Sequence, residues 1–418
     1  MNQRPVKVAV LGQGYVGLPL AILATEAGHQ VVGYDPDEVR VASLTEGRSY
    51  VEDVSDVRLA AALLKGYKAS TQPTVLSNFD VAVITVPTPL TEGVPDLSFV
   101  LAATDTVADF LRPGRLVVLE STTYPGTTEE LLGPSLESRT GLVAGIDFHL
   151  AYSPERIDPG NPQFNLANTP KLVAGITTQS LSMALDFYSS IIEKVVPVSR
   201  PREAELAKLI ENTFRHVNIA LVNEIAMFAH DLGVDIWEAL DSASTKPFGF
   251  MRFNPGPGVG GHCLPIDPSY LSWHVQKSLG QKFRFVELAN DINDHMPAYV
   301  VQRLMEGLNE RQVPLRGSKV MLVGLTYKPN TSDLRESPGL QIANRLDALG
   351  ADLLYVDSHV PLTTQIECVS LSAETIADMD AVVILTDHDD VDYRLIEQCA
   401  RYVLDTRRRC YGPQVERL

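Results

Sequence analysis

The segment that most constrains the fold is a glycine-rich turn between a strand pattern and a helix pattern near the start of the chain. Residues 6–11 (Val-Lys-Val-Ala-Val-Leu) indicate a buried strand, Gly12, Gly14 and Gly17 follow, and an alanine- and leucine-rich helix extends to about Ala27. In this setting the spacing Gly-x-Gly-x-x-Gly lets a pyrophosphate reach the amides at the amino end of the helix. The sequence therefore predicts a dinucleotide-binding unit of the Rossmann type.

A carboxylate ends the next predicted strand. Gln30–Tyr34 has the strand pattern, and Asp35 follows it, 18 residues after Gly17. A carboxylate here can accept hydrogen bonds from both ribose hydroxyls and would repel a 2′-phosphate. The sequence therefore favours NAD over NADP as the cofactor.

Further apolar runs continue the pattern and then give way to one long helix. Val81–Val86, Arg115–Glu120 and Leu172–Ala174 fit parallel strands, which completes a doubly wound domain of about 200 residues. From Glu203 to about Leu232, apolar residues recur every three or four positions. A helix of that length spans about 45 Å, more than one domain core needs. We expect it to bridge two domains, and it could also carry a dimer interface.

A second α/β pattern begins at Lys319–Leu325 and lacks the glycine fingerprint. It continues through a helix at 337–349 and strands at Asp352–Val356, Ala381–Thr386 and Tyr402–Asp405. The predicted fold class is α/β, with two Rossmann-like doubly wound domains joined by a long central helix. The expected boundaries are 1–202 for the NAD-binding domain, 203–312 for a central helical region and 313–418 for the second domain.

The run Asn254–Asp267 surrounds Cys263 with four glycines and three prolines. This composition predicts neither a helix nor a central strand, because glycine frees the backbone and proline stiffens turns. Such a loop can present a thiol at the floor of a pocket. The alternative is an ordinary loop with a half-buried structural cysteine.

Charge and cysteine content narrow the class of protein. A net charge of −17 argues against a nucleic-acid polymer or an anionic membrane surface as partner, although a small phosphorylated ligand needs only local cations. The four cysteines (263, 368, 399 and 410) form no CxxC pair and no ligand-spaced set, so we expect no metal site, no disulfide framework and a reducing cytoplasm. We also expect no signal peptide and no membrane span, because an apolar strand pattern starts within a few residues of the first and no 18-residue apolar run occurs.

Polar groups at two further places could do chemistry. Lys208 and Asn212 are four apart in the predicted long helix, so both lie on one face and could offer a cation and an amide to an oxyanion or a sugar hydroxyl. Glu155 stands in a turn-rich stretch after a strand-like segment and could act as a base or orient water. A solvated helix face and a surface turn are the alternatives.

Cations follow two strands of the second α/β pattern. Lys328 and Arg335 come after its first strand, where a phosphate-binding turn would lie, and Arg407–Arg409 follows its last. These are the local positive groups that a diphosphate requires. For the arginine run, a solvated charge cluster is the alternative.

The sequence resembles the nucleotide-sugar dehydrogenase family over essentially the whole chain, with the motifs in the same order. The motifs that carry the resemblance are Gly12–Gly17, Val86–Pro89, Ser121–Gly126, Ser153–Glu155, Glu205–Asn212, Gly258–Asp267 and Lys328–Ser337. The resemblance implies a four-electron oxidation of a sugar C6 alcohol to a carboxylate, with two NAD and one water. The expected substrate is a UDP-sugar held by residues 313–418, and the expected assembly is a homodimer or a higher homo-oligomer.

The same resemblance assigns roles to single residues. Cys263 matches the thiolate that carries the substrate as a thiohemiacetal and then a thioester. Lys208 and Asn212 match the groups that stabilise the oxyanion, while Asp267 and Glu155 match carboxylates of proton transfer and thioester hydrolysis. The implied cofactor positions are Gly12, Gly14, Tyr15, Val16, Gly17, Asp35, Arg40, Thr88, Thr122 and Arg335. The implied substrate positions are Glu155, Arg156, Lys208, Asn212, Gly260, Lys328 and Arg407.

Two residues of the cysteine loop bear on the substrate. Enzymes of the family that act on UDP-glucose usually read Gly-Phe-Gly-Gly-Ser-Cys, with a lysine just before the aspartate. This chain has His262 and Ile266 at those positions. The segments Pro255–Gly258, Ser121–Thr127 and Thr245–Phe250 look most like the branch that oxidises UDP-N-acetylglucosamine, and enzymes that act on UDP-N-acetylmannosamine share Gly-Gly-His-Cys but typically lack the Pro-Ile after it. UDP-N-acetylmannosamine and UDP-glucose remain alternatives. A two-electron hydroxyacid dehydrogenase and a catalytically silent nucleotide-sugar binding protein are the hypotheses outside the class.

Overall fold

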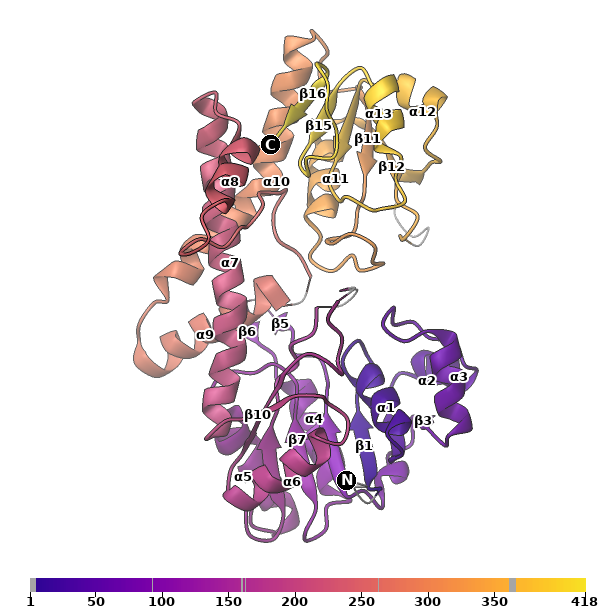
Figure 1. Ribbon diagram of the computed structural model, residues 1–418, viewed down its shortest axis with the longest axis vertical. Helices are drawn as coiled ribbons and strands as arrows, with labels where there is room; N and C mark the ends of the chain where they lie inside the picture. Colours follow the sequence, from indigo (N-terminus) through magenta and orange to yellow (C-terminus); the bar gives the residue numbers. More distant parts are fainter. Residues whose placement is uncertain (1–4, 92, 159–160, 162, 262, 361–365) are drawn as a thin grey trace. The chain divides into compact units, whose positions relative to one another are not determined.

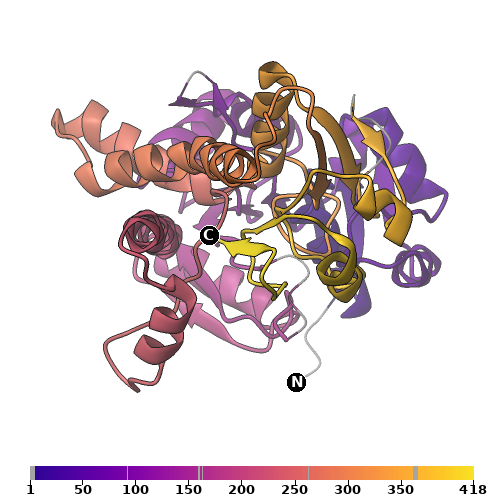
Figure 2. The ribbon, with the colours of Figure 1, turned by 90° about the horizontal axis from the view of Figure 1, so that it is seen from above.

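The computed structural model describes residues 5–91, 93–158, 161, 163–261, 263–360 and 366–418, with only the backbone of Cys263 (Figure 1). The chain forms two compact units, Met1–Glu211 and Asn212–Leu418. The boundary falls inside helix α7 (Pro201–Asp231), a continuous helix of 31 residues that Figure 2 shows end-on. The prediction of two Rossmann-like units and a long central helix is therefore confirmed.

The first unit is built on an eight-stranded sheet with the order β10-β9-β8-β7-β4-β1-β2-β3. The order reverses between β1 and β4, which is the crevice where doubly wound sheets bind ligands. The strands are β1 Lys7–Leu11, β2 Gln30–Tyr34, β3 Lys68–Ser70, β4 Val81–Ile84, β7 Leu116–Leu119, β8 His149–Tyr152, β9 Lys171–Gly175 and β10 Val195–Pro197. A separate hairpin pairs β5 (Leu90–Thr91) with β6 (Val94–Pro95).

One expectation about this sheet is wrong. The run at Leu172–Ala174 was expected to join as a parallel strand, but β9 pairs with β8 in the antiparallel direction, with Ala151 opposite Gly175 and Tyr152 opposite Ala174. A parallel pair needs a crossover, usually a helix, whereas an antiparallel pair does not. The described part of the connection from β8 to β9 is irregular, so the chain returns in the opposite direction.

Helices cover the sheet and bury the strands. The β1 core residues Val8, Ala9 and Val10 are buried, and α1 packs its apolar residues against them. Side chains of Asp37, Ser55 and Thr177 cap helices by accepting backbone N–H groups in the first turn. The helical elements are α1 Gly17–Glu26, α2 Glu38–Thr45, α3 Asp56–Leu64, η1 Pro73–Leu76, α4 Ser98–Ala108, η2 Thr127–Leu132, α5 Gly133–Thr140 and α6 Thr178–Tyr188.

The second unit carries a six-stranded parallel sheet with the order β13-β12-β11-β14-β15-β16. Its strands are β11 Lys319–Val323, β12 Asp352–Val356, β13 Glu367–Cys368, β14 Ala381–Ile384, β15 Val403–Asp405 and β16 Val415–Arg417. Its helices besides the second part of α7 are α8 Ile236–Ser244, α9 Cys263–Leu279, α10 Arg284–Glu310, α11 Pro338–Leu349, α12 Ala373–Ala377 and α13 Tyr393–Cys399. Among the described residues, no helix combines the length and apolarity that crossing a bilayer requires.

The first turn of the second unit repeats that of the first. The amide of Gly12 donates to Tyr34 O (2.8 Å), and the amide of Gly324 donates to Val356 O (3.0 Å). Both glycines have a positive φ, +91° and +80°. The chain after Gly324 continues without the second and third glycines of the fingerprint, so this turn repeats the backbone geometry without the close approach to a pyrophosphate.

The last residues of the cysteine loop have a different structure from the one that the sequence predicted. Helix α9 begins at Cys263 and includes Pro265 and Pro268, so the segment after Gly261 is not all loop. Pro265 is tolerated in the first turn of the helix because the amides there have no partner within the helix, whereas Pro268 lies inside α9. Cys263 thus stands at the amino end of a helix, and Asp267 lies at the end of its first turn.

Candidate active site

The glycine fingerprint lies at the end of β1 and leaves room on one side. A Cβ at Gly17 would lie 1.9 Å from Gly12 O and 2.4 Å from Thr85 Oγ1, so the turn and α1 pack too closely for a side chain. A Cβ at Gly14 would meet no atom within 4 Å. The open side at Gly14 and the amides of Tyr15 and Val16 before α1 fit a pyrophosphate approaching the helix.

Asp35 is buried directly after β2. Its carboxylate accepts the amides of Gln13 (2.8 Å) and Asp37 (3.0 Å), and Arg40 Nη1 lies 3.6 Å away. Gln13 is itself buried and is held by the hydroxyls of Tyr50 and Tyr67. Because a carboxylate offers about four acceptor sites, Asp35 keeps acceptor capacity for ribose hydroxyls.

Two threonines follow the neighbouring strands β4 and β7. Thr88 is buried and Thr122 is half-buried, and the loops that carry them are joined by a hydrogen bond from Ser121 Oγ to Val86 O (2.7 Å). The carboxyl ends of β1, β2, β4 and β7 therefore gather the expected cofactor positions of the first unit at one edge of the sheet.

Glu205 is a residue that sequence reasoning missed. It is buried in α7 and accepts the amides of Gly126 (2.5 Å) and Thr128 (2.9 Å) and the Thr128 hydroxyl (2.6 Å). Burial raises the pKa of Glu205 to about 7, against the opposing effect of these hydrogen bonds. The contact ties the turn after β7 to the helix that carries Lys208. An acidic residue within an otherwise apolar helix turn is the signal that could have identified it.

Glu155 and Arg156 follow β8 and are both engaged with the protein. Glu155 Oε1 accepts the amides of Arg156 and Ile157, each at 2.6 Å. Arg156 donates to Pro170 O (2.6 Å) and pairs with Glu211 (2.7 Å). Arg156 thus fastens this turn to α7, and its expected contact with the substrate stays a prediction.

Lys208 and Asn212 occupy positions one turn apart on α7, and both side chains are buried. Burial argues against the solvated helix face that was the alternative for this pair. In the second unit, Asn212 Nδ2 donates to Asp267 Oδ2 (2.5 Å), and Asp267 is 1% exposed. The structure therefore brings Asn212 to the first turn of α9, the helix that starts at Cys263. The Cys263 side chain and residue 262 lie outside the described residues.

The glycine loop packs closely against the turn after β11 in the second unit. The Gly261 amide donates to Arg335 O (2.9 Å). A Cβ at Gly260 would lie 2.6 Å from Tyr327 Cβ and 2.7 Å from Glu336 O, so only glycine fits at this contact. The loop is thereby fixed to the segment that carries Lys328.

Arg335 and Arg407 meet different environments in this unit. Arg335 donates to the Asp333 carboxylate (2.6–3.1 Å). Arg407 donates to Leu385 O (2.7 Å) and would come within 2.8 Å of a Cβ at Gly256, and burial lowers its pKa. The expected positions Gly260, Lys328, Arg335 and Arg407 therefore all belong to the turns at the carboxyl ends of β11 and β15 and to the loop beside them.

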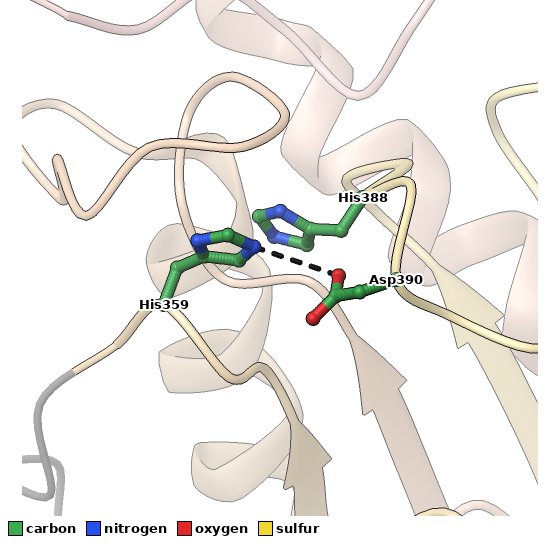
Figure 3. A group of neighbouring side chains, drawn as sticks. All are labelled: His359, His388 and Asp390. Atoms are coloured by element: carbon green, nitrogen blue, oxygen red, sulfur yellow. Dashed lines mark ion pairs between the residues drawn. The ribbon is translucent and has the colours of Figure 1, made fainter. Parts of the chain in front are cut away.

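A cluster of His359, which follows β12, with His388 and Asp390, which follow β14, has the residue types of a metal site (Figure 3). His359 Nε2 lies 3.5 Å from Asp390 Oδ1, and the His359 and His388 rings stack with centroids 4.6 Å apart. His388 Nδ1 accepts the Asn330 amide (3.0 Å), which leaves Nε2 to carry the proton toward Asp357 Oδ2 (3.1 Å). Both nitrogens of His388 are thus engaged, and the ring has no lone pair to give a metal.

Three domain models of one protein family match consecutive parts of the chain. Residues 6–192 match the NAD binding domain of the UDP-glucose/GDP-mannose dehydrogenase family, residues 202–295 its central domain and residues 321–412 its UDP binding domain.

Similar proteins differ in the sugar that their names give. The UDP-N-acetyl-D-mannosamine dehydrogenase of Pyrococcus horikoshii is 35% identical over 98% of this chain and 97% of its own. The UDP-N-acetyl-D-glucosamine 6-dehydrogenase of Pseudomonas aeruginosa is 39% identical over 82% of this chain and 80% of its own. The solved structure of a UDP-D-ManNAc dehydrogenase from Pyrococcus horikoshii matches with a TM-score of 0.90 at 34% identity, covering 98% of each chain.

Proposed function

The chain belongs to the UDP-glucose/GDP-mannose dehydrogenase family and binds NAD, and we propose that it oxidises the C6 alcohol of a UDP-N-acetylhexosamine to the carboxylate. We favour UDP-N-acetylglucosamine because Pro265 and Ile266 follow the cysteine. The observation that carries the proposal is the bond between Asn212 and Asp267 in the first turn of the helix that starts at Cys263.

In this proposal the residues of the first unit hold the cofactor. Gly14 gives the pyrophosphate access to the amino end of α1, and Asp35 accepts the ribose hydroxyls. NAD, when bound, accepts the hydrides removed from C6.

Cys263 carries the sugar between the two oxidations. Its thiolate forms a C–S bond to the C6 aldehyde, and the amino end of α9 favours the negative charge of a thiolate. Lys208 and Asn212 stabilise the oxyanion of the resulting thiohemiacetal, whose oxidation gives a thioester.

Carboxylates complete the reaction. Water attacks the thioester carbon, its proton passes to Glu155 or Asp267, the C–S bond breaks and the sulfur departs as thiolate. The sum is one alcohol, two NAD and one water converted to one carboxylate, two NADH and three protons. Lys328 and Arg407 are proposed to bind the diphosphate of the substrate.

A panel of UDP-sugars tests this function. We expect NADH and acid product with UDP-N-acetylglucosamine, at two NADH per sugar consumed, and weaker turnover with UDP-N-acetylmannosamine and UDP-glucose. The P. horikoshii relative favours the mannosamine epimer as the second candidate. Preferential turnover of UDP-N-acetylmannosamine or UDP-glucose would reject the proposed sugar. One NADH per sugar would indicate a two-electron dehydrogenase, and binding without NADH a silent binding protein.

We further propose that the central region, residues 203–312, carries the contact between two copies of the chain. In the second unit, four apolar residues on one face of α7 are 42–55% exposed: Phe214, Leu221, Ile225 and Phe228. Their spacing of three, four or seven residues places them on one stripe, and a two-fold axis lets the same stripe meet itself.

Molar mass in solution measures this contact. Light scattering is expected to give twice 45.7 kDa for the wild-type chain and a shift toward 45.7 kDa for Phe228→Asp, because the charge cannot be buried unpaired. A wild-type chain that is monomeric at high concentration would rule the interface out. The reducing cytoplasm, which keeps the Cys263 thiol available, is the compartment we propose.

A further inference from the structure

A buried group of charged side chains surrounds Glu155 in the first unit. Lys171 is 3% exposed and Glu120 is fully buried. Lys171 Nζ lies 3.0 Å from Glu120 Oε2 and 3.7 Å from Glu155 Oε2 and donates to Pro154 O at 3.2 Å. The Tyr188 hydroxyl donates to the other oxygen of Glu120. One ammonium therefore stands between two carboxylates, away from solvent.

The direction of β9 produces this arrangement. Glu120 follows β7, Glu155 follows β8, and Lys171 is the first residue of β9. Extending the antiparallel register, in which Ala151 faces Gly175, brings position 155 opposite position 171. In a parallel strand, the first residue would lie at the opposite edge of the sheet. The antiparallel strand thus delivers a lysine to the edge where the candidate catalytic carboxylate lies.

The charges in the group do not balance. Two carboxylates face one ammonium, and burial raises the pKa of Glu120 even with Lys171 beside it. Glu155 Oε2 is buried and accepts no hydrogen bond, while Oε1 accepts two amides. The neighbouring Arg156 pairs with Glu211. In the described part of the chain, Lys171 is thus a cation that faces this oxygen of Glu155, at 3.7 Å.

We propose that Lys171 is a positioning residue for Glu155: its ammonium, held by Glu120 and Tyr188, keeps the Glu155 carboxylate able to take the proton of the attacking water. The inference rests on the proposed role of Glu155 in thioester hydrolysis. Lys171 itself transfers no proton. It lowers the energy of the ionised carboxylate through its charge, and Glu120 competes with Glu155 for that charge.

The pH dependence of kcat tests the inference, because two variants are expected to move the acid limb of the profile in opposite directions. Lys171→Met removes the cation beside Glu155 and is expected to move the acid limb of the kcat profile to higher pH and to lower kcat at neutral pH about tenfold. Lys171→Arg restores the limb. Glu120→Gln frees the charge of Lys171 for Glu155 and moves the limb to lower pH. Lys194→Met, the same change at an exposed lysine of this unit, leaves the profile unchanged.

A purely structural ion pair gives a different pattern. Lys171→Met and Glu120→Gln would then lower activity and stability together with the acid limb in place, and that result overturns the inference. If Lys171→Met does not fold, the direction of the shift in Glu120→Gln decides by itself. The Glu155→Gln variant distinguishes a failure of the proposed role of Glu155 from a failure of the inference about Lys171. Wild-type kcat in that variant rejects the role of Glu155 and the inference with it, whereas a large loss of kcat combined with an unmoved limb in Lys171→Met rejects the inference alone.

Discussion

Replacing Cys263 with serine is expected to stop formation of the uronic acid after the first hydride transfer. A serine hydroxyl is a far weaker nucleophile than a thiolate near neutral pH, so the aldehyde is not carried into a thioester. We expect kcat for the acid to fall by about three orders of magnitude or more. Quenched-flow measurement of NADH and acid product per active site follows both oxidations separately.

The matched control is Cys368→Ser, at a half-buried free thiol on the edge strand β13 of the second unit. It is expected to keep wild-type turnover, because it removes the same sulfur away from the cysteine loop. Release of the acid by Cys263→Ser at the wild-type rate would contradict the covalent mechanism. An active Cys263→Ala variant would instead favour a two-electron hydroxyacid dehydrogenase, which needs no thiol.

Alanine at Gly17 is expected to destabilise the first unit strongly, whereas alanine at Gly14 is expected to leave its stability nearly intact. The Gly17 Cβ would lie 1.9 Å from a backbone oxygen that cannot move without displacing β1. We expect a loss of about 3 kcal/mol in the free energy of unfolding for Gly17→Ala. The Gly14 Cβ would enter open space, and its backbone needs no positive φ.

The effect on NAD binding is expected at Gly14 rather than at Gly17. The space beside Gly14 is where the pyrophosphate approaches α1, so Gly14→Ala should raise KM for NAD about tenfold with little change in unfolding. Urea denaturation and the NAD dependence of the rate measure the two effects independently. A Gly14→Ala variant with wild-type KM for NAD would show that the cofactor lies elsewhere.

Local patterns accounted for much of the fold. The strand at Gln30–Tyr34 has the predicted bounds, and α7 begins and ends within two residues of the predicted helix. Strand and helix periodicity depend on neighbouring residues, so they can be recognised without the rest of the chain. The end of the cysteine loop was misjudged because its prolines suggested irregular chain, yet the first turn of a helix accepts a proline such as Pro265.

Site residues could be predicted from the sequence only where they lie directly after one strand or on one face of one helix. Asp35 at the end of β2 and the pair Lys208 and Asn212 on α7 belong to that class. The bond from Asn212 to Asp267 and the bonds from Glu205 to the turn at Gly126 join residues 55 and 79 positions apart. No local pattern specifies such contacts.

The sequence by itself determined the dinucleotide turn with its flanking strand and helix, because glycine spacing and apolar periodicity express short-range geometry that each segment carries on its own, and the resemblance of its motifs indicated the family. Only the tertiary structure decided the direction of β9 and the place of Lys171 between Glu120 and Glu155. The physical reason is that the direction of a strand depends on the connections between the strands of the whole sheet. A buried charge is tolerated only where distant segments bring its partners together.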